Sequence, residues 1–327
     1  MERFIIIDGN AILHRAFHAL PPLTTSKGAQ INAAYGFTSM LLRVVHDLNP
    51  QYLTVTFDRP KPTFRKSIYV GYQAKRPKMD DGLSCQIEMT HQVVRGLRIP
   101  IFELDGYEAD DLIGTISKQV KSQKSKVKTT TQKSKVEDFE TIIVTGDRDI
   151  LQLVDDVTKV YMPVKGISES KMYGEKEVEE KFGIKPSQFI DYKSLVGDAS
   201  DNYPGVAGVG PKTAADLIKQ FGTLEEIYAH LDKIENKKLA EKLAKGAEDA
   251  GMAKKLATIV RDTPVTLELD KCKIKEFDTL ETEQLFQELE FRSLIPRLSG
   301  KDSKTQRVKE EKKKEEKKPE GEQTKLF

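Results

Sequence analysis

Hydrophobic positions in the first half of the chain fall into two patterns. Three short apolar runs rich in β-branched residues are typical of strands buried on both faces of a parallel sheet. These runs are 3–9 (RFIIIDG), 52–58 (YLTVTFD) and 141–147 (TIIVTGD). A fourth run, 99–105, predicts a further strand, and segments 32–48 and 84–97 repeat apolar residues at helical spacing. Strands alternating with helices predict an α/β domain around a mostly parallel sheet.

The pattern changes at about residue 174, where short helical segments and turns replace the strands. We therefore expect a catalytic-type sheet domain over 1–173 and a helical region over 174–298. Residues 121–138 and 299–327 are polar, charged and nearly free of large apolar side chains, so they can bury little surface. We expect the first to be a disordered insertion and the second a disordered charged tail.

The composition is that of a protein without membrane-spanning or secretory segments. The 327 residues are 32% charged and 38% hydrophobic, and no apolar run approaches the roughly 20 residues that span a bilayer. The short apolar start is no secretory signal, and Cys85 and Cys272 form no recognisable motif. We expect a cytoplasmic monomer that does not bind membranes. The net charge of +2 balances 53 basic against 51 acidic residues, so the placement of charge matters more than its sum.

Carboxylates recur where the predicted strands end. Because parallel strands share one carboxyl edge, which is also where ligands bind, side chains after different strands meet there. The set comprises Asp8, Asp58, Glu108, Asp110, Asp111, Asp147, Asp149, Asp198 and Asp201. Any one alone is more simply a turn or cap residue. Nine together would repel one another severely unless cations lie among them.

Oxygen ligands without cysteine or paired histidine favour hard cations, so we expect two Mg²⁺ or Mn²⁺ ions. His14 and His18 are spaced i,i+4 but lack an acidic third ligand, which favours packing or substrate contact. Enzymes that hydrolyse phosphate esters often use two such ions. The sequence therefore predicts a nuclease or a phosphatase.

Two segments favour a nucleic-acid substrate. Segment 205–222 (GVAGVGPKTAADLIKQFG) has the pattern of a helix–hairpin–helix, in which Gly205, Gly208, Gly210 and Lys212 hold a phosphate near a helix N-terminus. Segment 59–78 interleaves basic and aromatic residues, as single-stranded nucleic acid requires, although a solvated basic loop would look similar.

With these motifs in order, residues 3–298 resemble the 5′-nuclease domain of bacterial DNA polymerase I, within the flap endonuclease superfamily. The motifs are IIIDGNAILHRAFHAL, TTSKG…NAAYGF, VTFDRPKPTFR, GYEADDLIGT, VTGDRDILQLV and GDASDNYPGVAGVGPKTAADLI. The resemblance implies a PIN-like sheet flanked by helices, a helical arch and a helix–three-turn–helix DNA clamp that often carries K⁺. It also implies a structure-specific 5′-3′ exonuclease and 5′-flap endonuclease that acts on DNA flaps, nicks and RNA primers in replication and repair.

The resemblance also implies roles for individual residues. Asp8, Asp58, Glu108, Asp110 and Asp111 would serve the first metal site, and Asp147, Asp149, Asp198 and Asp201 the second. Tyr72 and Arg76 would approach the scissile phosphate from the arch, with Lys27 and Arg65 as substrate contacts. Gln73 stands where the family's Y-K-x-x-R motif has a lysine, and the absence of that lysine would slow turnover. Lys75 could replace the lysine only if the arch helix were turned.

Two rival functions remain open. A haloacid-dehalogenase-type phosphatase would need a D-x-D motif after the first strand, where this chain reads DGN. A catalytically weak module that binds branched DNA would explain Gln73 without requiring cleavage.

The last five residues, QTKLF, resemble the Q-x-x-L-F peptide with which bacterial replication proteins bind the sliding clamp. Gln323 would fix the orientation of the peptide, and Leu326 and Phe327 would fill an apolar pocket. We expect clamp binding through this tail, which would raise the local concentration of the enzyme at a nick.

Overall fold

Strand β1 (Glu2–Asp8) lies inside the central sheet, which explains its unbroken apolar run. In the computed structural model, which describes residues 2–127, 139–165 and 169–299, Phe4 and Ile6 pack on one face of the sheet while Ile5 and Ile7 pack on the other. All four side chains are at most 1% exposed. A strand covered on both faces must be apolar throughout.

The sheet has six strands in the order β3-β2-β1-β4-β5-β6, and only β6 runs antiparallel to its neighbour. The other strands of this sheet are β2 (Tyr52–Thr56), β3 (Ile101–Phe102), β4 (Phe139–Val144), β5 (Thr158–Lys165) and β6 (Glu169–Tyr173). The predicted mostly parallel α/β architecture is therefore confirmed. The sequence interpretation did not include β5 and β6, which fall in a stretch assigned to no element.

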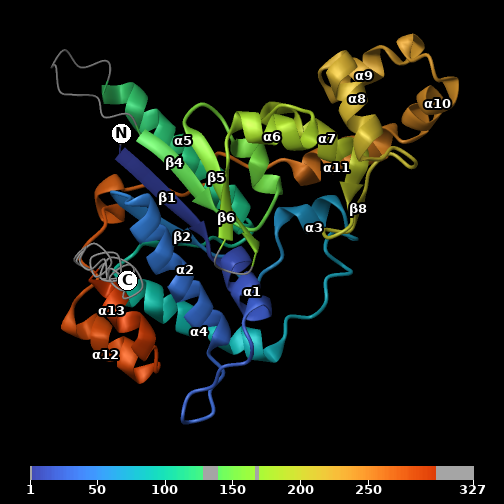
Figure 1. The fold of residues 1–327 in the computed structure, drawn as a ribbon. Coiled ribbons are helices and arrows are strands. Elements are labelled where there is room, and N and C mark those ends of the chain that lie inside the picture. The colour runs from blue at the N-terminus through green and yellow to red at the C-terminus, as the bar shows by residue number, and fades with distance from the viewer. Residues whose placement is uncertain (1, 128–138, 166–168, 300–327) are drawn as a thin grey trace, which may run out of the picture.

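Helices cover both faces of the sheet (Figure 1). One face packs against the helices α1 (Gly9–Ala19), α2 (Asn32–Leu48) and α4 (Asp81–Gly96). The other packs against α5 (Ala109–Val127) and continues into the helical region. The α2 prediction is correct to the residue. The expectation of disorder across 121–138 is wrong for its first seven residues, because α5 continues through them, and residues 128–138 lie outside the described chain.

The helical region follows β6 and carries a two-stranded ladder. Its elements are α6 (Glu175–Phe182), the 3₁₀ turn η2 (Pro186–Gln188), α7 (Phe189–Val196), β7 (Gly197–Asp198), β8 (Tyr203–Pro204), α8 (Pro211–Phe221), α9 (Leu224–Ala229), η3 (Leu231–Lys233), α10 (Lys237–Lys245) and α11 (Ala247–Ala257). Helices α8, α9 and α10 project away from the sheet in Figure 1. A continuous apolar core joins this region to the face of the sheet that α5 covers.

The chain then returns to the sheet domain. The last described elements are η4 (Leu269–Cys272), α12 (Leu280–Glu288), η5 (Arg292–Leu294) and α13 (Ile295–Leu298). Phe286 and Phe291, both fully buried, pack into the core of α2 and α4, and α12 and α13 lie beside these helices in Figure 1. The two ends of the described chain thus share one core.

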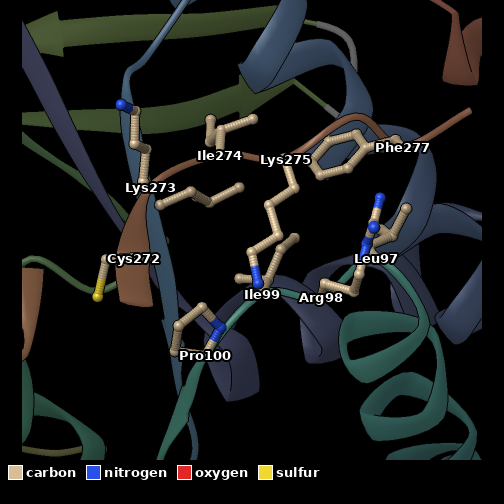
Figure 2. A pocket seen from close by; sticks show the side chains of 10 residues that line it. Leu97, Arg98, Ile99, Pro100, Cys272, Lys273, Ile274, Lys275 and Phe277 are labelled. Carbon is tan, nitrogen blue, oxygen red and sulfur yellow. The ribbon is translucent and has the colours of Figure 1, made fainter. Parts of the chain in front are cut away.

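A small pocket lies where this returning segment meets the sheet. Figure 2 shows Leu97, Ile99, Cys272, Lys273 and Phe277 among its lining residues. It contains only about 160 Å³ of empty space, and it lies beside the amino ends of β2 and β3, opposite to the carboxyl edge. It is therefore no candidate for the site of a nucleic-acid reaction. Among the described residues, no helix combines the length and apolarity that crossing a membrane requires.

Candidate active site

The carboxyl ends of three adjacent strands, β2, β1 and β4, bring the first carboxylates together. Asp8 ends β1, caps α1 by accepting the N–H of Ala11 at 3.0 Å, and accepts the hydroxyl of Thr145 at 2.6 Å. Asp58 follows β2 and accepts the N–H of Ala109, the first residue of α5, at 2.7 Å. Asp58 therefore fixes the start of α5 at the edge of the sheet where Asp8 lies.

The start of α5 contributes Glu108 and Asp110. Burial, together with the charges of Asp147, Asp8 and Asp58, raises the pKa of the Asp110 carboxyl well above its usual range. Burial likewise raises the pKa of Glu108, against the lowering effect of Arg65. Carboxylates that raise one another's pKa in this way form a site whose negative charge needs a cation.

A second group of carboxylates adjoins the first. Asp149, in the 3₁₀ helix η1 (Asp149–Leu153), Asp198 and Asp201 each place one oxygen within 4.8 Å of the others. The ammonium of Lys193, on α7, lies among them: it pairs with Asp149 at 2.7 Å and also with Asp198. Burial raises the pKa of Asp149 to about 7, although Lys193 opposes this. Asp147 links the groups, since it accepts the N–H of Asp149 at 2.8 Å and raises the pKa of Asp110.

The carboxylates of this site offer only oxygen donors, the type of ligand that hard divalent cations take. In this structure the ammonium of Lys193 partly neutralises Asp149 and Asp198. Sequence reasoning missed Lys193, because a lysine five residues before an aspartate is an ordinary surface pattern. Only the fold shows that it is mostly buried, with 14% of its side chain exposed.

Asp111 differs from the other predicted metal ligands. It is fully buried, and both its oxygens accept hydrogen bonds from the guanidinium of Arg65 at 2.8 Å. Arg65 also donates to the carbonyls of Leu256, in the last turn of α11, and Thr258, just after that helix. At 2% exposure it faces the interior, where a substrate contact is not available. The geometry therefore disagrees with the predictions of Asp111 as a metal ligand and of Arg65 as a substrate contact. Instead, the ion pair joins α3 (Phe64–Ile68) and α5 to the helical region.

The segment between α3 and α4 places several side chains in contact with the carboxylates. The hydroxyl of Tyr72 donates to Glu108 at 3.1 Å and to Asp201 at 3.2 Å, and Arg76 pairs with Asp201 at 2.7 Å. Gln73 also reaches this aspartate, through its backbone N–H to the Asp201 carbonyl at 2.7 Å and its side chain to the carboxylate at 3.4 Å.

The helix expected across this segment is not formed. Residues 71–76 form successive turns, and Gln73 has a left-handed φ of 56°. The helical-spacing argument about Lys75 therefore does not hold. Lys75 itself is exposed.

Lys27 lies on a hairpin-like loop closed by backbone pairing of Thr24 with Gln30. The carboxylate of Glu290 accepts the backbone N–H of Ser26 at 3.0 Å and also its hydroxyl. The C-terminal return thus holds the loop that exposes Lys27, and Glu290 carries no sequence signal for this role.

The predicted hairpin joins β8 to α8, and the structural setting of each of its glycines is different. Gly205 has no room for a side chain, because a Cβ there would lie 2.4 Å from the backbone nitrogen of Gly197. Gly208 has a φ of 79°, and a Cβ there would meet the ammonium of Lys242 at 2.7 Å. Gly210 begins α8 with open space beside it, and no side chain of the described residues caps that helix. Lys212 is exposed in its first turn.

The family models that match this chain place it among the nucleases. The family model "5'-3' exonuclease, N-terminal resolvase-like domain" matches residues 3–183, and "5'-3' exonuclease, C-terminal SAM fold" matches residues 184–280. The chain belongs to the 5′-3′ exonuclease family.

Curated relatives agree with this assignment. The chain is 37% identical to a 5′-3′ exonuclease of Aquifex aeolicus over 90% of this chain and 94% of that protein. It is 39% identical to a DNA polymerase I of Bacillus caldotenax over 94% of this chain, and it spans about a third of the length of that relative (33%).

Two solved structures share the fold. A T5 5′-exonuclease with bound divalent metal ions (zinc) superposes with a TM-score of 0.62 at 20% identity, covering 79% of this chain and 90% of that chain. The catalytic core of Rad2 in complex with DNA substrate gives 0.56 at 15% identity, covering 90% of this chain and 92% of that chain.

Proposed function

We propose that this protein hydrolyses phosphodiester bonds at the 5′ ends and 5′ flaps of DNA, including RNA primers, with two Mg²⁺ or Mn²⁺ ions. The observation that carries the proposal is a cluster of eight carboxylates from the ends of β1 and β2, the start of α5, the segment after β4 and the β7–β8 ladder. The set is Asp8, Asp58, Glu108, Asp110, Asp147, Asp149, Asp198 and Asp201. A cluster with this much mutual repulsion is costly to fold and has a use only when cations bind it.

The residues divide by position. Asp8, Asp58, Glu108 and Asp110 would hold one ion, and Asp149, Asp198 and Asp201 the other, with Asp147 between them. Two such ions, when bound, lower the pKa of the attacking water and stabilise the leaving oxygen. Lys193 must withdraw from Asp149 and Asp198 for the second group to bind its ion.

Tyr72 and Arg76 are proposed to contact the scissile phosphate. Both now bond to Asp201, so a cation at that carboxylate would free the Arg76 guanidinium to bind a phosphate oxygen. Gln73 can donate a hydrogen bond in the same place but supplies no positive charge. Lys75 is exposed beside it and stays a proposed catalytic contact.

Lys27 and the hairpin residues Gly205, Gly208, Gly210 and Lys212 are proposed to grip the duplex backbone. Gly210 supports this most directly, because a Cβ there would meet nothing within 4 Å and its side of the uncapped start of α8 is open to a phosphate. A K⁺ ion on the hairpin carbonyls belongs to the same proposal.

Cleavage of a 5′-flap DNA in Mg²⁺ tests the proposal. Asp110→Asn should abolish cleavage while its affinity for the flap in Ca²⁺ survives, and Asp278→Asn, an exposed aspartate before α12, should cleave normally. Full cleavage by Asp110→Asn would contradict the two-metal assignment. Flap binding without cleavage by the wild-type protein would favour the weak binding module instead.

Clamp binding through Gln323, Leu326 and Phe327 remains a proposal from the sequence, because the tail lies outside the described residues. A calorimetric titration of the sliding clamp should show binding to the full chain and none to a variant lacking Leu326 and Phe327. Equal binding by both would contradict it.

A further inference from the structure

Tyr203, the first residue of β8, has a buried hydroxyl group without a partner. Its side chain is 4% exposed, and its oxygen accepts or donates no hydrogen bond within the described chain. A buried polar group left in this state destabilises the fold, because it has given up its hydrogen bonds to water. Such a cost is expected to persist where the group acquires a partner in another state of the protein.

The position of Tyr203 indicates where that partner would lie. The ladder of β7 and β8 pairs Tyr203 directly with Asp198, so the two side chains lie on the same face. The phenol also lies close enough to Asp149, Asp198 and Asp201 for their charges to act on it. A phenolic hydroxyl carries one hydrogen that it can donate to a carboxylate.

The ring is also held in place. It stacks on the ring of Tyr72, with the ring centroids 6.4 Å apart and the planes differing by 17°. This distance lies within the range of roughly 4.5–7 Å that favourable aromatic pairs adopt. Tyr72 in turn bonds to Glu108 and Asp201. Tyr203 is thus fixed between the segment that crosses the site and the second group of carboxylates.

In the present arrangement the oxygens of Asp149 and Asp198 are occupied by Lys193, and Asp198 also accepts bonds from Ser200. A divalent cation in that place would displace the ammonium and reorient the carboxylates around itself. A ligand carboxylate oxygen then needs a donor on its outer side, as metal ligands in proteins generally have.

We infer that Tyr203 is a positioning residue of the second cation subsite, whose hydroxyl donates a hydrogen bond to the Asp149–Asp198–Asp201 group once a divalent cation replaces Lys193. This inference rests on the proposed function, since it requires that group to bind a cation. It concerns one atom, the phenolic oxygen, so removing that atom alone tests it.

The test is a calorimetric Mn²⁺ titration of the full chain, with melting temperatures measured in the absence of metal. Tyr203→Phe keeps the stacked ring and removes the hydroxyl. Tyr228→Phe, on α9, is the matched control, because its hydroxyl is also buried without a partner in the described structure and its charged neighbour is Asp249 instead. Asp201→Ala removes a proposed ligand.

Both tyrosine variants should melt at a higher temperature than the wild-type protein without metal, because each loses an unsatisfied group. Only Tyr203→Phe should also weaken the lower-affinity Mn²⁺ site, by about tenfold or more. A purely structural role for Tyr203 would raise the melting temperature and leave the Mn²⁺ affinity unchanged.

Unchanged Mn²⁺ affinity in Tyr203→Phe, with loss of the site in Asp201→Ala, would overturn this inference and leave the proposed function standing. Unchanged affinity in both variants would overturn the inference together with the second metal site. A lower melting temperature for metal-free Tyr203→Phe would also overturn it, because the hydroxyl would then already have a partner.

Discussion

At the scale of single residues, Asp110 and Asp111 are neighbours with opposite environments. Asp110 faces other carboxylates, which together with burial raise its pKa, whereas Asp111 faces the guanidinium of Arg65. Helical geometry explains the difference, since consecutive side chains point about 100° apart around the axis. One residue therefore belongs to the acidic edge and the next to the interior.

The first prediction compares these two aspartates by stability. Asp111→Asn should destabilise the protein by about 3–5 kcal/mol, because it leaves a buried guanidinium without its countercharge. Asp110→Asn should instead stabilise the metal-free protein, because it removes a carboxylate whose ionisation burial and the neighbouring carboxylates disfavour. Urea denaturation at pH 7 measures both. Equal effects of the two substitutions would contradict the division of roles.

The second prediction concerns Gln73. If the absence of a cation limits the reaction, Gln73→Lys should raise the single-turnover rate of flap cleavage, up to roughly 10²-fold, because one electrostatic donor at a developing charge has this effect. Lys75→Ala should change the rate little. The opposite pattern, a large loss from Lys75→Ala and no gain from Gln73→Lys, would assign the role to Lys75.

At the scale of elements, the hairpin before α8 contains one glycine with a positive φ, Gly208, and one with a negative φ, Gly210. Gly208 needs its positive φ, so a substitution there tests folding as much as binding. Gly210 has a φ of −96° and meets nothing within 4 Å. A methyl group added at Gly210 therefore contacts no other part of the described protein and would interfere only with a bound phosphate.

The third prediction follows from this difference. Gly210→Ala should keep the wild-type melting temperature but weaken binding to flap and plain duplex DNA alike, since phosphate contacts carry no sequence information. Fluorescence anisotropy at several salt concentrations measures the affinity. Gly251→Ala, which also adds a methyl group in open space but on α11, is the control. Unchanged affinity of Gly210→Ala at moderate salt would exclude the hairpin from the interface.

At the scale of the whole molecule, ion pairs across the sheet complement its shared core. Glu140 of β4 accepts bonds from Arg3 of β1 at 2.9 Å and from Lys159 of β5 at 2.7 Å, so it links three strands. Although burial acts in the opposite direction, these two partners hold the pKa of Glu140 below its usual range. A lowered carboxyl pKa stabilises the fold only while the group is ionised.

The fourth prediction gives the pH dependence of this effect. Glu140→Gln should cost about 1 kcal/mol at pH 7, a value reduced from that of a fully buried pair because both cations are partly exposed. The cost should persist above the usual glutamate pKa of about 4.3 and disappear as the pH falls through the lower, folded value. Denaturation between pH 3 and 8 tests it, with Glu179→Gln on α6 as an exposed control. A cost that does not change with pH would contradict the ion-pair account.

The sequence by itself determined the strands β1, β2 and β4, the helix α2, and the acidic edge that their order creates. This was possible because buried parallel strands need unbroken apolar runs and because parallel strands share a carboxyl edge. It did not reveal β6, which forms one edge of the sheet, or its neighbour β5, because both strands mix polar with apolar residues.

Only the tertiary structure decided which acidic and basic residues belong together. Arg65 and Asp111 are far apart in sequence and read as a surface cation and a metal ligand until folding buries them as a pair. Lys193 among the carboxylates, Glu290 on the Lys27 loop and the orphan hydroxyl of Tyr203 carry no local pattern. Their roles arise from contacts between distant segments, and a charged or hydroxyl-bearing residue has the same local sequence signature whether it is solvated or buried against a partner.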